Sequence, residues 1–173
     1  MQSRDIAPHE ILLPVRPVFI VFTLIAALLV NLLPWSGTML TVKPDFVALV
    51  VLYWCIQQPR KLGFTAAWLM GLIMDVADGT LFGQHALAYS VLAFAGIVLH
   101  RRVLMFTMKD QILHVIPLLL VNDLIVLVIR KIGGADFPGF GYFVGSFIAG
   151  ALWPLLSFLL KLPQQPAPDP DDV

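Results

Sequence analysis

The stretch PVFIVFTLIAALLVNLLP, residues 17–34, is apolar on every helical face and contains no charged residue. A strand of a membrane β-barrel would instead alternate polar and apolar side chains with a period of two. A hydrocarbon core about 30 Å thick requires about 20 apolar residues for one helical crossing. The stretch therefore predicts a membrane-spanning α-helix.

The composition of the whole chain agrees with this prediction. Of 173 residues, 59% are hydrophobic and 13% are charged, whereas an ordinary soluble domain is about 45–50% apolar. Eleven Lys and Arg residues balance eleven Asp and Glu residues, so the chain has no basic field to gather nucleic acid. We expect an integral membrane protein that does not bind nucleic acid.

Five more apolar blocks follow the first one, which covers about residues 17–34. They span about residues 45–57, 62–78, 84–106, 111–130 and 140–161. We predict an all-α polytopic membrane protein, a compact bundle of about six transmembrane helices, in which residues 1–162 form a single domain. The tail at residues 163–173 is rich in Pro and Asp and has nothing to bury, so we expect it to be disordered and cytoplasmic.

The distribution of Lys and Arg predicts the orientation of the bundle. If the N-terminus is cytoplasmic, eight of these residues lie on the inner side and three on the outer side. The inner residues are Arg4, Arg16, Arg60, Lys61, Arg101, Arg102, Lys109 and Lys161, and the outer residues are Lys43, Arg130 and Lys131. Cytoplasmic loops carry the excess of positive charge, so both termini are predicted to be cytoplasmic, although Arg130 and Lys131 oppose this at the last hairpin.

Small side chains recur every four residues in two blocks. In the third block they are Gly63, Ala67 and Gly71, and in the last block they are Gly141, Gly145 and Ala149. Four residues turn a helix by about 400°, so each set forms a stripe that lets another backbone approach closely. We expect both stripes to pack helices, either inside the bundle or against the transmembrane helix of a partner.

Two carboxylates lie inside apolar blocks, where an ionisable group is costly unless it is paired. For Asp75 the alternatives are helix packing near the outer interface and the handling of ions or substrate. For Asp123, which follows Asn122, the alternatives are an interhelical hydrogen bond and a proton relay. Asp75, Asn31 and His114 are possible partners of Asn122 and Asp123, and the sequence does not choose among them.

Sequence motifs of catalysis and of metal binding are not found. The four histidines lack the spacing of a metal pair on one helix, and the single Cys55 can neither close an intrachain disulfide nor anchor a Cys-rich zinc site. The chain has no phosphate loop, dinucleotide fingerprint, zinc-protease motif or Gly-x-Ser-x-Gly elbow. We therefore expect a protein that is not an enzyme and uses no cofactor or metal.

The stretch from Pro44 to Arg102 resembles the MreD family of bacterial rod shape-determining proteins. The resemblance rests on Pro44-Asp45-Phe46, Tyr53-Trp54, Pro59-Arg60 followed by Gly63, Gly71-Leu-Ile-Met-Asp75, Gly83-Gln84-His85-Ala86-Leu87-Ala88-Tyr89 and His100-Arg101-Arg102. It implies a non-enzymatic scaffold of the cell-elongation complex in the inner membrane. Such a scaffold binds the bitopic periplasmic protein MreC and helps couple the MreB cytoskeleton to peptidoglycan synthesis. RodA and a class B penicillin-binding protein are implied as further members.

The family is also similar in fold to the substrate-binding components of energy-coupling-factor transporters. This likeness leaves a second hypothesis open, a small-molecule transporter subunit of the vitamin-binding type. The resemblance places a candidate cavity or partner surface at the outer end of the third and fourth helices. Its residues are Asp75, Asp78, Gly83, Gln84 and His85.

Overall fold

The computed structural model describes residues 15–37 and 42–164, and these residues form helices and their connections without any strand. The helices are α1 (Pro17–Asn31), α3 (Phe46–Gln57), α4 (Phe64–Ala77), α5 (Gln84–Met105), α6 (Met108–Ile132) and α7 (Val144–Lys161), with short 3-10 helices η1 (Phe140–Phe143) and η2 (Leu162–Gln164). The predicted all-helical class is confirmed. The fifth block begins earlier than expected, at Met108, and the last block divides into η1 and α7.

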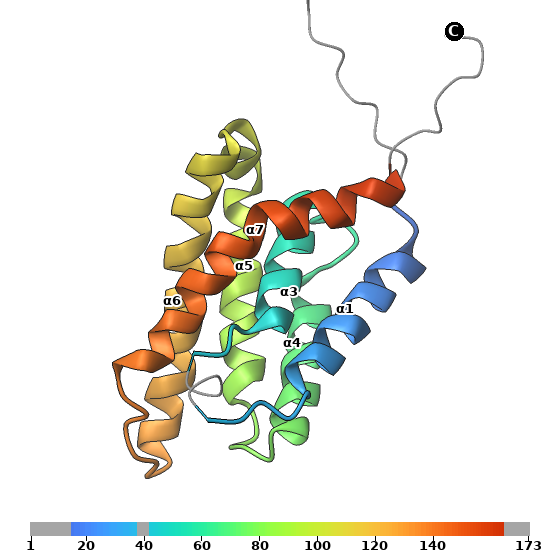
Figure 1. Cartoon of the computed structure of the whole chain (residues 1–173). Coiled ribbons are helices and arrows are strands. Elements are labelled where there is room, and N and C mark those ends of the chain that lie inside the picture. The colour runs from blue at the N-terminus through green and yellow to red at the C-terminus, as the bar shows by residue number, and fades with distance from the viewer. Residues whose placement is uncertain (1–14, 38–41, 165–173) are drawn as a thin grey trace, which may run out of the picture.

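Successive helices run in opposite directions, so the connections gather at two ends of the bundle (Figure 1). The described connecting residues 32–37, 42–45, 78–83 and 133–143 lie at one end, which we call the long-loop end. The connections at residues 58–63 and 106–107 lie at the opposite, short-loop end, where α1 begins and α7 ends (Figure 1). Every helix therefore contributes one terminus to the long-loop end.

Helix α3 is the centre of the bundle and contacts α1, α5, α6 and α7. Ten of its 12 residues are buried, which explains why this block is apolar on all faces. Trp54 at its core is fully buried and donates a hydrogen bond from its indole nitrogen to Thr23 of α1 over 2.9 Å. Tyr53 packs edge-on against Trp153 of α7, with ring centroids 5.8 Å apart.

The helices differ in their ability to cross a membrane. The segments Gln84–Met105, Met108–Ile132 and Phe140–Gln164 are long and apolar enough for a crossing, whereas α1, α3 and α4 are apolar but shorter. At about 1.5 Å per residue, the 12 residues of α3 rise only about 18 Å. The six predicted crossings thus correspond to three full-length spans and three short helices. The structure is that of a helical membrane protein.

The predicted tail begins inside an ordered turn. Pro163 and Gln164 belong to η2, where Gln164 is buried and its side-chain amide donates to the Leu160 carbonyl over 2.6 Å. Residues 165–173 lie outside the described residues, so the expectation of a disordered tail stays a prediction for that part.

Candidate functional site

Asp75 closes the turn between α4 and α5. Its fully buried carboxylate accepts hydrogen bonds from the backbone nitrogens of Gly83 (2.8 Å) and His85 (2.9 Å), and Ala86 follows at 3.4 Å. The first N–H groups of a helix have no partner within the helix, and a negative charge there is favourable. Asp75 therefore caps α5 from the neighbouring helix, and the packing interpretation accounts for its partners.

A side-chain contact and a backbone conformation further fix this turn. The Nδ1 atom of His85 lies 2.9 Å from Asp75 Oδ1, within hydrogen-bond distance. Gly83 has a φ angle of 100°, a left-handed conformation that side chains with a Cβ atom rarely adopt. Residues 83–85 thus hold the N-terminus of α5 against the carboxylate of Asp75.

The first small-residue stripe packs α4 against α5 at one of its glycines. A Cβ atom on Gly71 would lie 2.6 Å from the His85 carbonyl carbon and would collide with Ala86. Ala67 is fully buried on the same helix. Gly63 differs, because it is the N-cap residue of α4 and a Cβ atom there would meet nothing within 4 Å. Gly63 therefore does not pack closely against another helix within the described residues, and packing against the helix of a partner stays a prediction for it.

The second stripe is divided between two elements. Gly145 lies against the backbone of Lys43 and Pro44, and Ala149 is buried on the same helix, α7. Gly141 lies in η1, before α7 begins, and is half-buried. Because a 3-10 helix has about three residues per turn, Gly141 does not continue the stripe of α7.

Asp45 joins three helices at the long-loop end, a role that we did not predict. Its Oδ1 atom caps α3 by accepting from the Ala48 backbone nitrogen, and it also accepts from the Asn31 amide, each over 3.0 Å. Its Oδ2 atom accepts from the Tyr89 hydroxyl over 2.8 Å. An Asp directly before an apolar block is a typical N-cap signal, so the sequence contained a clue to this role.

Asp123 forms an interhelical hydrogen bond with a partner that the sequence did not suggest. The hydroxyl of Ser146 on α7 donates to Asp123 Oδ2 on α6. None of the three possible partners bonds to it, because Asp75 caps α5, Asn31 bonds to Asp45, and His114 contacts the Asp110 carbonyl at 2.7 Å on the exposed side of α6. The contact between α6 and α7 accounts for Asp123 without a relay.

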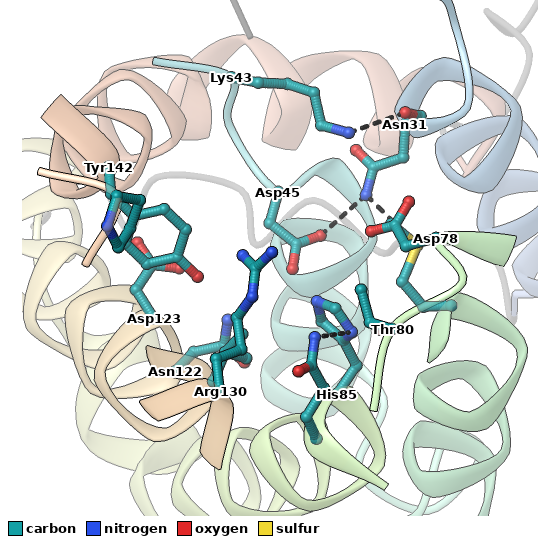
Figure 2. Close-up of a pocket in the computed structure, with 14 residues that line it drawn as sticks. Asn31, Lys43, Asp45, Asp78, Thr80, His85, Asn122, Asp123, Arg130 and Tyr142 are labelled. Atoms are coloured by element: carbon teal, nitrogen blue, oxygen red, sulfur yellow. Dashed lines mark hydrogen bonds between the residues drawn. The ribbon is translucent and has the colours of Figure 1, made fainter. Parts of the chain in front are cut away.

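A polar cavity of about 440 Å³ opens among these groups at the long-loop end (Figure 2). It is lined by Asn31, Lys43, Asp45, Met74, Asp78, Thr80, Gln84, His85, Asn122, Asp123, Val126, Arg130, Pro138 and Tyr142. Of the predicted site residues, Asp78, Gln84 and His85 line it, whereas Asp75 and Gly83 are used in the turn beside it. Asn122, Asp123, Lys43 and Arg130 lie far from that motif in the chain, so only the fold brings them to the cavity.

The cavity combines carboxylates with two cations. Asp45, Asp78 and Asp123 face it together with Lys43 and Arg130. Within the described part of the chain, no three His, Cys, Asp or Glu side chains are grouped to hold a metal ion. The arrangement can bind a polar or charged group through hydrogen bonds and ion pairs.

A family model and a known protein match the chain, and both carry the same description. A family model described as rod shape-determining protein MreD matches residues 14–162. The rod shape-determining protein MreD of Haemophilus influenzae is 30% identical over 141 residues, which is 79% of this chain and 85% of that protein. No solved structure matches the chain, so the expected likeness to energy-coupling-factor components gains no support.

Proposed function

The chain belongs to the family of the rod shape-determining protein MreD, and on that premise we propose that it is a non-enzymatic scaffold of the rod complex in the bacterial inner membrane. It binds MreC directly, and MreB, RodA and a class B penicillin-binding protein are further members of the complex. In this way it helps couple the cytoskeleton to peptidoglycan synthesis. The observation that carries the proposal is the family match over residues 14–162, which include every described α-helix.

The charge distribution supports an orientation with cytoplasmic termini. Seven described cations, Arg16, Arg60, Lys61, Arg101, Arg102, Lys109 and Lys161, belong to the short-loop end, and three, Lys43, Arg130 and Lys131, belong to the long-loop end. The positive-inside rule then assigns the short-loop end to the cytoplasm. Two of the three outer cations line the cavity. The position of Arg130 in the cavity explains why this cation lies at the outer end. The last hairpin therefore argues less strongly against the proposed orientation.

The exposed helix faces are suited to the binding of a partner helix in the membrane. Exposed apolar side chains follow a 4-3-4 spacing on α1 (Val18, Phe22, Ile25, Leu29) and on α5 (Leu87, Val91, Phe94, Val98). Such ridges can pack against lipid or against the helix of a partner that crosses the membrane once. With the cavity facing outward, the periplasmic part of such a partner would leave the membrane beside the long loops.

Co-purification tests the scaffold proposal. The tagged full chain, extracted from its native membrane in mild detergent, is expected to recover MreC in a fixed ratio, whereas a tagged unrelated polytopic protein should recover none. A folded, monodisperse chain that recovers no MreC would contradict the proposal. Tight binding of a vitamin to the purified chain would favour the transporter hypothesis instead.

A further inference from the structure

Two buried amide side chains in the cavity have an oxygen without a hydrogen-bond donor. Gln84 is fully buried and Asn122 is 2% exposed, and neither Gln84 Oε1 nor Asn122 Oδ1 has a partner among the described residues. Both residues line the cavity. Because folded proteins pair nearly all buried polar atoms, two orphaned acceptors in one cavity indicate that a group from outside the chain supplies the donors.

Asp123 adds a carboxyl group to the same floor. It is 8% exposed and lines the cavity, and its Oδ2 atom accepts the hydrogen bond from Ser146. The floor thus offers three acceptors, two amide oxygens and one carboxyl group. A primary ammonium group carries three N–H donors, no acceptor and a positive charge, so it matches all three.

The rim of the cavity carries two cations beside the carboxylates of Asp45 and Asp78. Lys43 and Arg130 are half-buried there, and Figure 2 shows them on opposite sides of Asp45. Lys43 donates to the Asn31 carbonyl over 2.8 Å, and Arg130 makes no ion pair with any described carboxylate. The planar guanidinium of Arg recognises a phosphate or a carboxylate with two parallel hydrogen bonds, and Lys binds phosphate as a point charge. Arg130 and Lys43 are therefore the groups at the rim that suit an anion.

We propose that the cavity binds a small zwitterion in which a short linker joins a primary ammonium to a phosphate. The ammonium lies on the floor with Gln84, Asn122 and Asp123, and the phosphate lies at the rim with Arg130 and Lys43. A volume of about 440 Å³ is within the range of small-ligand sites, roughly 300–1,000 Å³. Ethanolamine phosphate has this chemistry, either as the headgroup of phosphatidylethanolamine or as a free compound. The proposal does not depend on the scaffold function.

Choline compounds provide the matched probe, because their nitrogen carries the same charge but no N–H donor. The full chain is placed in phosphatidylglycerol nanodiscs that contain either phosphatidylethanolamine or phosphatidylcholine, and retained lipid is counted by native mass spectrometry. In a second arm, O-phosphoethanolamine and phosphocholine are titrated by calorimetry. We expect about a tenfold preference for the ethanolamine compound, the size of effect that one lost charged hydrogen bond produces. A preference in the lipid arm alone identifies the headgroup as the source, and one in the soluble arm identifies the free compound.

Asn122→Leu tests the placement of the ammonium. It removes an orphaned acceptor with little change in volume, so the ligand-free protein should melt at the same or a higher temperature while the ethanolamine preference is lost. The matched control is Ser157→Ala, which removes another buried, unpartnered oxygen, on α7 toward the short-loop end. It should leave the preference unchanged.

A further variant tests the rim. Arg130→Gln, at a half-buried position, should weaken the ethanolamine and choline compounds alike because both contain the phosphate. No preference in either arm with the wild-type chain would overturn the proposal. So would a preference that survives Asn122→Leu.

Discussion

Replacing Asp75 with Ala is expected to prevent accumulation of the folded chain. The substitution leaves the backbone N–H groups of Gly83 and His85, and the His85 ring, without their buried acceptor. Each orphaned donor costs about 1–3 kcal/mol, so the total loss should reach about 3 kcal/mol or more, against a typical stability of about 5–15 kcal/mol. The measurement is the yield of monodisperse protein in detergent and its melting temperature.

Asp78→Ala is the matched control for this variant. Asp78 has the same charge, follows three residues later and is exposed, and its side chain makes no hydrogen bond within the described residues. It should give a wild-type yield and melting temperature. Asp75→Asn keeps one acceptor oxygen and should fall between the two. Equal stability of Asp75→Ala and Asp78→Ala would show that the carboxylate does not hold the turn.

Replacing Gly71 with Leu should be equally damaging, through packing. The first carbon of the new side chain would already collide with the backbone of α5 at Ala86, and backbone cannot rotate away as a flexible side chain can. Overpacking in a close-packed interior costs about 1–3 kcal/mol even where side chains can adjust, so a backbone collision should exceed that range. We expect loss of the folded chain and, with it, of recovered MreC.

A pair of alanine variants makes this prediction specific. Gly71→Ala should lower the melting temperature clearly, because its single added carbon lies 2.6 Å from the His85 carbonyl carbon. Gly63→Ala adds the same carbon at the start of the same helix, where nothing lies within 4 Å, and should behave nearly as the wild type. If the two variants had the same melting temperature, α4 and α5 would not be packed as closely as the structure shows.

The sequence predicted the elements that depend on local composition. All six apolar blocks became helices close to their expected bounds, because continuous apolar runs have few alternatives in a membrane. The stripe at Ala67 and Gly71 was predictable from its four-residue spacing. Gly63 and Gly141 share that spacing, but Gly63 caps a helix and Gly141 lies in a 3-10 turn. Spacing alone does not reveal where a helix begins.

The cavity was only partly predictable, for a related reason. Asp78, Gln84 and His85 lie within one short segment, so a motif could indicate them together. Asn122 and Arg130 reach the same cavity because α6 ends beside the start of α5, and their pairing depends on the three-dimensional arrangement. Likewise, the partner of Asp123 is Ser146 of α7, to which no motif pointed.

Cell shape after depletion tests the central claim, that the chain acts in rod shape determination, most directly. In the bacterium that encodes it, the chain is depleted, its loss is verified by immunoblot, and the ratio of cell length to width is measured by microscopy. We predict that the cells become round, that wild-type chain restores rods, and that Gly71→Leu does not. Rods of normal length and width after verified depletion would contradict the account.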